Sequence, residues 1–461
     1  MERIGVLVVS YGAREAAMVD AFSRSKKYTV DLYIADRYGN PFNIEKAKEH
    51  VVIPDLSVDT ICKFAEKRKD KIRFGIVGPE GPIIAGVRDV VERETGIPMI
   101  CPTKEYAIEA SKIAQRHLFQ EVVPEANPRF KVFDPKNYSR AADVKEDLWK
   151  WLDELDNQVA VKPDGVSAGK GVGVWGDHFV DRDQLFENFL SNYKYGPVIV
   201  EEKVVGEESS FQAFCDGKHF LPLPETRDNK RAFDGDKGSN TGGMGSYKDV
   251  NDWLPFMIRD EWEEEVAVAK KLFRGLKGRG SNPGLRGIPF YLAFMHTGKG
   301  VKILENNSRP GDPEIQNLLP ILKDDFIDVC LRMIEGALNK VEFERQATVV
   351  TYKVPPTYGG KMKEFTGDRR VELSEAYRLS RDYSGRMKVY PAALELRDGE
   401  TYALTSRTVC VVGIADDISG AREISLKGID AIKGGGLWSR RDIASKEHIE
   451  RSITHMKTLR R

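Results

Sequence analysis

The sequence has no excess of charge of one sign and no long hydrophobic run, and both absences exclude classes of partner. Lys and Arg together number 71, as do Asp and Glu, so the formal net charge at pH 7 is zero. Binding to nucleic acid or to an anionic membrane needs a concentrated positive field, so we expect neither partner. No stretch reaches the ~18 apolar residues that span a bilayer, and the N-terminal apolar run is too short for a signal peptide. We therefore expect a protein that is neither exported nor membrane-spanning.

The cysteine and histidine patterns that bind zinc are also missing. The five cysteines lie far apart in the sequence, at Cys62, Cys101, Cys215, Cys330 and Cys410. Without a CxxC pair there is no zinc or redox motif, and the absence of a disulfide framework favours a reducing, cytoplasmic compartment. The seven histidines form no HxxxH pair, which excludes the usual zinc hydrolases.

The length and the apolar pattern predict several domains. A chain of 461 residues corresponds to about three domains at roughly 150 residues each. From residue 4 to residue 103, short apolar runs alternate with helix-like stretches, which predicts a parallel, Rossmann-like α/β domain at 1–103. Ligands bind beyond the carboxyl ends of such strands, so the loops at 10–14 and 78–82 are candidate binding loops.

The rest of the chain mixes helices and strands in a less regular order. We expect a helix over 107–117, and two strands at 289–296 and 301–305 joined by a hairpin turn over 297–300. Strands at 386–392 and 409–414, followed by helical segments, predict a small α+β domain at 341–461. The predicted fold class is therefore a multidomain combination of α/β and α+β units.

The densest motif is a glycine-rich loop after the apolar strand that ends at Lys162. Glycines at 165, 169 and 171 permit the backbone conformations with which a loop turns N–H groups onto phosphate, and Lys162 and Lys170 supply positive charge. A tight hairpin turn is the simpler alternative. The loop is one residue short of a Walker A motif, and the GxGxxG match over 171–176 has no helix directly after it, so neither of those sites is predicted.

A second motif follows the strand expected at 301–305. The period of two along a strand places Glu305 and Asn307 on one face, and their oxygens are hard ligands that suit Mg²⁺. Arg309 follows in the next turn. The alternative is a polar strand end with a Gly-Asp turn.

Two further polar segments complete the pattern. At 198–208 an apolar strand turns acidic before the next strand, which predicts a hinge that can hold adenine and ribose, with a solvated acidic edge as the alternative. The segment 228–245 is a long, polar, glycine-rich loop of a kind that usually has a function. We expect it to contact substrate, with a mobile lid that binds nothing as the alternative.

These motifs, in this order, resemble the phosphoribosylamine–glycine ligase family of the ATP-grasp superfamily. The resemblance spans nearly the whole chain and also rests on the segments 78–82, 102–104, 109–112 and 311–314, and more loosely on 406–409 and 439–443. It implies an ATP-grasp domain at 104–340, with a lid at about 122–196, between the N-terminal and C-terminal domains.

The resemblance also implies a reaction. Members of the family join glycine to 5-phosphoribosylamine, using ATP and Mg²⁺ or Mn²⁺, and release glycinamide ribonucleotide, ADP and phosphate in purine biosynthesis. Glycyl phosphate is the intermediate. The partners so implied are these small molecules only, and the chain is expected to act as a monomer or a small homo-oligomer.

Residue roles follow from the same resemblance. The implied catalytic residues are Arg309 and Lys162. Those implied to bind ATP are Lys112, Lys162, Gly165, Gly169, Lys170, Gly171, Glu201, Glu202, Val204 and Glu208. Those implied to bind the other substrates are Gly12, Glu80, Asp228, Lys230, Arg231 and Asp312. The implied metal ligands are Glu305 and Asn307.

The sequence departs from the family pattern at several positions. The loop at 10–16 reads SYGAREA where the family has a GSGGREH type, so two glycines and a histidine are lost. Ala293 stands where many members have a Gln or Glu that binds a second metal, and Asn229 stands where a histidine is frequent. These departures leave two alternatives open: a ligase for a different carboxylate and amine, or a non-catalytic paralogue that binds ATP.

Overall fold

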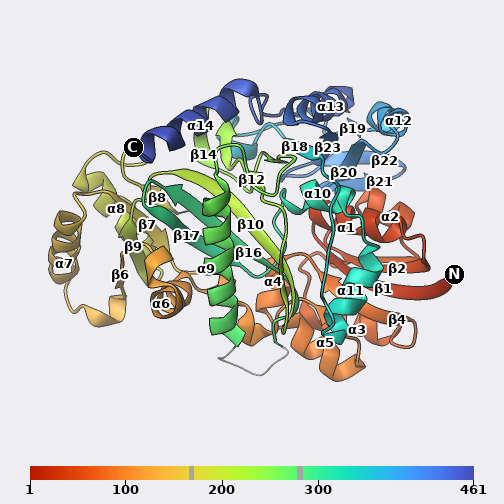
Figure 1. Cartoon of the computed structure of the whole chain (residues 1–461), viewed down its shortest axis with the longest axis horizontal. Helices are drawn as coiled ribbons and strands as arrows, with labels where there is room; N and C mark the ends of the chain where they lie inside the picture. Colours follow the sequence, from red (N-terminus) through yellow and green to blue (C-terminus); the bar gives the residue numbers. More distant parts are fainter. Residues whose placement is uncertain (166–170, 278–283) are drawn as a thin grey trace.

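The N-terminal part of the chain folds around a parallel sheet. In the computed structural model, which describes residues 1–165, 171–277 and 284–461, the strands lie in the order β3-β2-β1-β4-β5 (Figure 1). They are β1 Glu2–Ser10, β2 Tyr28–Asp36, β3 Glu49–Val52, β4 Ile72–Val77 and β5 Met99–Ile100. The helices between them are α1 Ala13–Ser23, α2 Pro41–Lys46, α3 Val58–Glu66, α4 Glu80–Ile84 and α5 Val87–Thr95. The ladders are parallel, so the prediction from the alternating pattern is confirmed.

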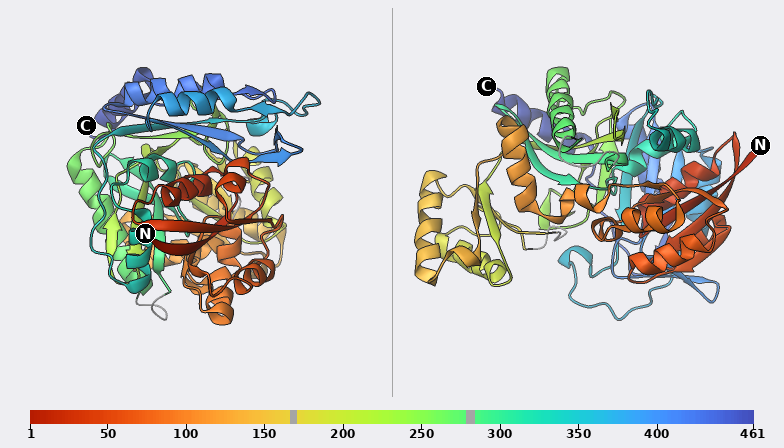
Figure 2. Two further views of the ribbon diagram at one scale, coloured as in Figure 1. Left: turned by 90° about the vertical axis from the view of Figure 1, so that its right-hand side faces the viewer. Right: turned by 90° about the horizontal axis from the view of Figure 1, so that it is seen from below.

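A small lobe projects from the body of the molecule (Figures 1 and 2). Its antiparallel sheet has the order β6-β9-β7-β8. The elements of the lobe are β6 Phe130–Phe133, α7 Ala141–Glu154, β7 Val159–Pro163, β8 Gly173–Val174, α8 Arg182–Tyr193 and β9 Val198–Glu202, with the 3₁₀ turns η3 Pro124–Ala126 and η4 Pro135–Asn137. The apolar residues Val159, Val161, Val198 and Val200 pack with α7 and α8 in a separate core. Because side chains alternate along a strand, the opposite face of β7 and β9 carries Ala160, Lys162 and Glu201.

A second antiparallel sheet forms the middle of the molecule, in the order β11-β10-β16-β17. Its strands are β10 Glu207–Asp216, β11 Phe220–Pro222, β16 Arg286–Thr297 and β17 Gly300–Asn307. Thr297 pairs with Gly300, which confirms the predicted hairpin. The helices α6 Lys112–Val122 and α9 Arg259–Lys277 share a core of phenylalanine and leucine side chains with this sheet.

The helix expected over 107–117 starts later than the sequence pattern indicated. The chain first makes two 3₁₀ turns, η1 Lys104–Tyr106 and η2 Ile108–Ala110. Ser111 then caps α6, because its side chain accepts a hydrogen bond from the Ala114 N–H at 3.1 Å. The cap at Ser111 therefore separates the 3₁₀ turn η2 from the start of α6.

The C-terminal sheet joins strands that lie far apart in the sequence. Its order is β12-β15-β18-β23-β20, and β15 pairs with β18 across residue 341. The strands are β12 Arg227–Asp228, β15 Gly245–Lys248, β18 Ala347–Lys353, β20 Met387–Pro391 and β23 Val409–Ala415, the last two as predicted. Short strand pairs are β13 Arg231–Phe233 with β14 Lys237–Asn240, β19 Val371–Glu372 with β24 Lys433–Gly434, and β21 Leu394–Arg397 with β22 Glu400–Ala403. The remaining helices here are η6 Tyr358–Gly360, α12 Ser374–Asp382, α13 Ile418–Ala431 and α14 Lys446–Leu459.

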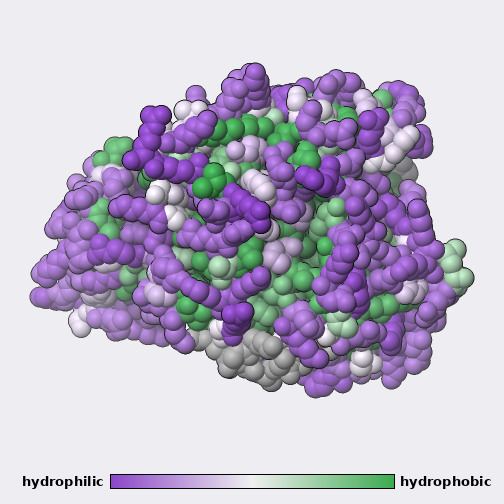
Figure 3. Space-filling model, viewed as in Figure 1, coloured by the Kyte–Doolittle hydropathy of each residue, from purple (hydrophilic) through white to green (hydrophobic). Residues whose placement is uncertain are grey.

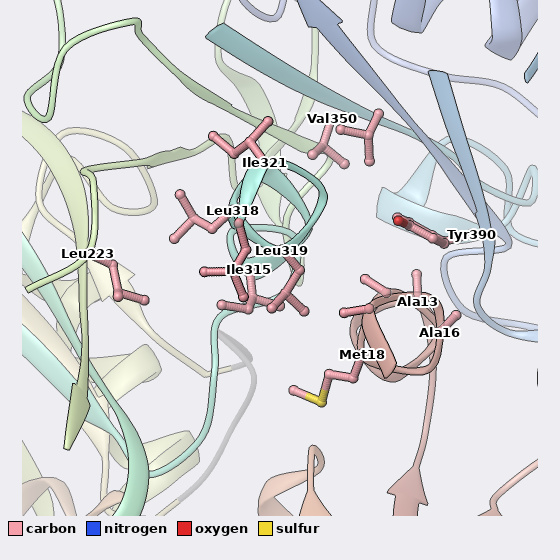
Figure 4. Packing of buried hydrophobic residues seen from close by; sticks show 14 of the residues in the cluster. Ala13, Ala16, Met18, Leu223, Ile315, Leu318, Leu319, Ile321, Val350 and Tyr390 are labelled. Atoms are coloured by element: carbon pink, nitrogen blue, oxygen red, sulfur yellow. The ribbon is translucent and has the colours of Figure 1, made fainter. Parts of the chain in front are cut away.

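One apolar core connects the N-terminal, central and C-terminal parts. It forms around α10 Ile315–Leu318 and η5 Leu319–Ile321, which precede α11 Phe326–Glu335. Figure 4 shows Ile315 and Leu319 facing the α1 side chains Ala13 and Met18, with Tyr390 of β20 close by. This packing fixes the chain directly after the 305–314 motif.

The surface matches the composition. Hydrophilic residues cover most of the face in Figure 3, and hydrophobic residues show mainly between them near its middle. Among the described residues, no helix has both the length and the apolar character needed to cross a membrane. All five cysteines are buried thiols.

Candidate active site

Lys162 lies at the base of the glycine-rich loop and contacts Glu201 on the neighbouring strand. In the β7–β9 ladder Glu201 is opposite Ala160, so Lys162 is its diagonal neighbour on the same face. The two side chains form an ion pair, and only 3% of Glu201 is exposed. Glu201 thus orients Lys162, the lysine that the sequence analysis predicts to bind phosphate. The sequence analysis predicts a different role for Glu201, in the segment that holds adenine.

Arg116 holds the other oxygen of Glu201. Its Nε donates to Glu201 Oε2 at 2.7 Å, and its two Nη atoms donate to the carbonyls of Ile303 and Leu304, each at 2.8 Å. Burial by itself would raise the pKa of Glu201, but the charges of Arg116 and Lys162 outweigh it and lower that pKa. Arg116 therefore joins α6, β9 and β17 into one rigid unit behind Lys162.

The start of α6 holds the first residues of the glycine-rich loop. Lys112 donates to the Gly165 carbonyl, while the Asp164 carboxylate accepts from the Ser111 hydroxyl at 3.1 Å and from the Ile113 N–H at 3.2 Å. Gly165 and Gly171 have φ of +82° and +80°, which a residue with a side chain adopts only with strain. Gly169 and Lys170 lie outside the described residues.

Glu305 is a buried carboxylate that lies within the electrostatic field of several cations. Strand β17 places it on the same face as Asn307, as predicted, and Asn307 is 7% exposed. Burial would raise the pKa of Glu305, yet nearby positive charges hold it below its ordinary value. Within the described part of the chain, the cations that lower it most are Lys230, Lys162, Arg309 and Lys112.

This arrangement fits a divalent cation bound through few protein ligands. The described residues contain no group of three or more His, Cys, Asp or Glu side chains that could enclose a metal. Mg²⁺ usually takes one or two protein oxygens and completes its shell with phosphates and water, and Glu305 with Asn307 matches that donor set. Ala293 is the ladder partner of Glu305, so the methyl group of an alanine stands where a second ligand would be expected.

The hinge between β9 and β10 connects the lobe to the central sheet. The N–H groups of Glu202 and Lys203 donate to the Arg129 and Gln158 carbonyls, each at 2.9 Å, and Val204 is half-buried beyond them. Glu208 follows on β10, where its carboxylate pairs with Lys230. The Glu208 carboxylate can therefore accept hydrogen bonds from a ribose only while it also contacts Lys230, or after it releases Lys230.

Arg309 lies between two carboxylates. Its Nε is 3.6 Å from Glu109 Oε1 and 3.8 Å from Glu80 Oε2. Glu109 also accepts the Ser308 N–H at 2.8 Å, and burial raises its pKa to about 7. For Glu80, burial is outweighed by the charges of Arg309 and Arg14, so its pKa is lowered.

The altered N-terminal loop is closed by its own glutamate. The Glu15 carboxylate accepts the Gly12 N–H at 2.8 Å and the Arg14 Nε at 2.6 Å, and Arg14 reaches the Pro310 carbonyl at 3.0 Å. A Cβ on Gly78 would lie 1.6 Å from Glu15 Oε1, so only glycine fits against this carboxylate. The Gly12 N–H is therefore engaged within the protein.

The polar loop at 228–245 contacts both the lobe and the C-terminal part. Arg231 donates to Asp177 of the lobe at 2.6 Å. Arg407 forms an ion pair with Asp312 at 3.0 Å and also donates to the Gly242 and Gly243 carbonyls. Asp312 further accepts from the Tyr352 hydroxyl at 2.6 Å. Of the residues expected to bind substrate, Asp312 and Arg231 thus have strong protein partners.

Several residues of this cluster had no predicted role. Arg116 lies four residues after Lys112, one turn along α6, and only the three-dimensional contact with Glu201 reveals it. The segments named in the sequence analysis include Glu109, Glu314 and Arg407. A sequence motif does not show which of its residues contact one another in the folded protein.

Comparison with known proteins places the whole chain among relatives of one kind. Residues 4–109 match the Phosphoribosylglycinamide synthetase N domain, and residues 115–315 match its ATP-grasp (A) domain. The chain is 36% identical over 458 residues to phosphoribosylamine–glycine ligase of Methanocella arvoryzae, covering 99% of each chain. It is 35% identical over 461 residues to the Pyrococcus furiosus enzyme of that name, covering 99% of this chain and 98% of the relative.

Solved structures show the same fold. The crystal structure of phosphoribosylamine–glycine ligase from Thermotoga maritima matches with a TM-score of 0.72 at 22% identity, covering 95% of this chain and 100% of that one. A biotin carboxylase domain from Hydrogenobacter thermophilus, solved with MgADP, matches with a TM-score of 0.66 at 14% identity, covering 98% of this chain and 93% of that one. From the full-length relatives and the two matched domains, the chain belongs to the phosphoribosylglycinamide synthetase family.

Proposed function

We propose that the chain ligates glycine to 5-phosphoribosylamine at the expense of ATP, giving glycinamide ribonucleotide, ADP and phosphate. The observation that carries the proposal is that Lys162 and Lys112 are held at the base of the glycine-rich loop, by Glu201 and by the Gly165 carbonyl. Their charges, with those of Lys230 and Arg309, also act on Glu305, and a triphosphate with a divalent cation needs positive charge and a carboxylate together. The full-length relatives named phosphoribosylamine–glycine ligase support the choice of substrates.

In this proposal the nucleotide lies between the lobe and the central sheet. The hinge at Glu201, Glu202 and Val204 would take adenine through its backbone, because the Glu201 carboxylate already binds Lys162 and Arg116. Glu208 would take the ribose. Lys112, Lys162 and the glycine-rich loop would neutralise the phosphates. Glu305 and Asn307 would hold Mg²⁺ or Mn²⁺, whose charge would add to that of the surrounding cations.

The chemistry then needs positioning more than covalent catalysis. A glycine carboxylate oxygen attacks the γ-phosphorus, ADP leaves, and glycyl phosphate forms. The amine of the second substrate attacks the carbonyl carbon of glycyl phosphate and displaces phosphate, losing one proton. Arg309 would stabilise the charge on the transferred phosphoryl group, and Glu109 and Glu80 keep its side chain in place.

The small lobe is proposed to close over the nucleotide as a hinged lid, covering residues from about 122 to 196. The Arg231–Asp177 contact supports this, because it joins the lobe to the loop at 228–245 that is expected to contact substrate. Limited proteolysis with and without ATP tests it, and identical cleavage in both conditions would argue against closure. The five buried thiols fit work in a reducing cytoplasm.

The proposed activity is tested by measuring ADP release with Mg-ATP, glycine and freshly made phosphoribosylamine, and with each omitted in turn. Turnover that requires all three supports the proposal. A Lys162→Met variant should lose turnover, whereas Lys150→Met, on an exposed helical ion pair, should retain it. Binding of ATP without turnover for any amino acid would favour the non-catalytic alternative.

A second candidate is a ligase that joins a different carboxylate and amine. The closed N-terminal loop favours it, because the Gly12 N–H, which would otherwise face the phosphorylated amine, is bonded to Glu15. A panel of amines and carboxylates in the same assay separates the two, since turnover without glycine or without phosphoribosylamine would support the second candidate.

A further inference from the structure

Strand β17, which carries Glu305 and Asn307, lies at the edge of its sheet. In the order β11-β10-β16-β17, it has a neighbouring strand on one side only within the described ranges of the chain. One row of its backbone N–H and C=O groups therefore needs partners other than a strand. The helix α6 and the turn η2 contact β17, and their side chains supply these partners.

Gln115 on α6 binds the peptide group that follows Glu305. Its Oε1 accepts the Asn306 N–H at 2.8 Å, and its Nε2 donates to the Ile108 carbonyl at 3.1 Å. Gln115 is 4% exposed, and both polar atoms of its side chain are engaged within the protein. Because a peptide unit is planar, holding the Asn306 N–H fixes how the whole unit between Glu305 and Asn306 is turned.

A β-bulge precedes Glu305, and Arg116 holds it. The ladder to β16 shifts at this point, so that Leu304 is an extra residue between the paired Ile303 and Glu305. In a regular strand consecutive carbonyls point to opposite edges, whereas here the carbonyls of Ile303 and Leu304 both accept from Arg116, each at 2.8 Å. Bulges re-aim nearby side chains, so this one helps to set the direction of Glu305.

The same edge is held again after Asn307. Glu109 of η2 accepts the Ser308 N–H at 2.8 Å, and the Ser308 hydroxyl accepts the Glu109 N–H at 3.3 Å. Side chains of α6 and η2 are thus bonded to the backbone before, between and after the two proposed metal ligands. They take the place of a neighbouring strand along residues 303–308.

Helix α6 also holds the groups proposed to bind phosphate. Lys112, in its first turn, donates to the Gly165 carbonyl. Arg116, one turn later, binds Glu201, which in turn pairs with Lys162. One helix therefore sets the placement of the phosphate-binding lysines relative to the strand of Glu305. This placement matters because Mg²⁺ is bound by protein oxygens and phosphate oxygens together.

We propose that Gln115 is a positioning residue for the divalent cation, because it fixes the peptide group between Glu305 and Asn307. The inference rests on the proposed function, which places Mg²⁺ or Mn²⁺ at those two residues, and it adds a residue that does not touch the ion. Groups that orient metal ligands in this way typically change metal affinity by about 10- to 100-fold when they are removed.

The test measures equilibrium binding of a non-hydrolysable ATP analogue in Mg²⁺ and in EDTA. The wild type is measured first, and tighter binding in Mg²⁺ supports the proposed metal site by itself. Gln115→Met removes the acceptor of the Asn306 N–H and keeps a side chain of similar length. It should weaken binding in Mg²⁺ about 10-fold and change binding in EDTA by less than about 2-fold, because only the metal-dependent part of the affinity is lost.

A matched control and a second variant accompany this measurement. Gln184 Oε1 also accepts a backbone N–H, that of Val180 at 3.0 Å, but at an exposed position of α8. Gln184→Met should therefore leave binding unchanged in both conditions. Gln115→Asn has a shorter side chain that does not reach Asn306, so it should act like Gln115→Met, and it carries the test if Gln115→Met does not fold.

Two results would overturn the inference while leaving the proposed function intact. The first is an equal loss of affinity in Mg²⁺ and in EDTA, which would indicate a purely structural role for Gln115. The second is an effect of Gln115→Met in Mg²⁺ no larger than that of Gln184→Met. A wild type that binds the analogue equally well with and without Mg²⁺ would instead refute the proposed metal site, and the inference with it.

Discussion

Replacing Arg116 by methionine tests the buried contacts behind Lys162. The Arg116 side chain is 3% exposed and binds Glu201 at 2.7 Å and two β17 carbonyls at 2.8 Å. Among the described residues, Arg116→Met leaves Glu201 paired with Lys162 alone, and it removes the arginine N–H groups that donate to both carbonyls. Breaking a buried ion pair by removing one partner typically costs about 3–5 kcal/mol. That is a large part of the roughly 5–15 kcal/mol that stabilises a folded protein.

The assay is urea-induced unfolding of the wild type, Arg116→Met, Glu201→Gln and the double variant. Each single change should lower the free energy of unfolding by about 3–5 kcal/mol, and the double variant should lose at least about 1 kcal/mol less than the sum. Arg129→Met is the matched control, because its pair with Glu154 is more than half exposed and should contribute under about 1 kcal/mol. Additive losses, or a loss for Arg116→Met as small as that of the control, would refute the reasoning.

Three further changes have defined outcomes. Because burial raises the pKa of Glu109 from 4.5 to about 7, this group lowers stability as pH rises through that window, by at most about 3 kcal/mol. Glu109→Gln should remove that loss, which is measured as the difference in the free energy of urea unfolding between pH 5 and pH 8. The same difference in the wild type and in Glu109→Gln would contradict the prediction. Glu305→Gln should raise the Mg²⁺ concentration needed for half-maximal ADP release by about 10- to 100-fold, and an unchanged Mg²⁺ requirement would contradict this. Arg407→Met should cost about 3–5 kcal/mol in unfolding experiments because Asp312 loses its cation; a cost under about 1 kcal/mol would mean the pair is not buried in solution.

Much of the fold follows from patterns of local periodicity. The alternating apolar runs of residues 4–103 gave the parallel sheet, and the turn at 297–300 gave the β16–β17 hairpin, because both signals are local. The pairing of β15 with β18 could not be predicted, since it joins segments about a hundred residues apart and depends on the shared core around α10. The start of α6 was misplaced because the Ser111 cap outweighs a continuous apolar pattern.

At the candidate site, the sequence indicated residue types, but not the contacts between them. Glu305 and Asn307 share a strand face, as a period of two requires, and Lys162 lies next to the glycine-rich loop. The partner of Lys162 could not be read from the sequence, because Glu201 and Arg116 come from different elements. Likewise, a motif containing Asp228 does not reveal that its Oδ1 has no hydrogen-bond partner within the described ranges of the chain, which is a property of packing.

The central claim is that glycine is activated as an acyl phosphate in this site. Glycine labelled with ¹⁸O in its carboxylate tests it most directly, because attack on the γ-phosphorus places one carboxylate oxygen in the bond to phosphorus. The account predicts that the phosphate released in the complete reaction carries one ¹⁸O per turnover, as measured by mass spectrometry. Phosphate without the label, released together with the product amide, would contradict it.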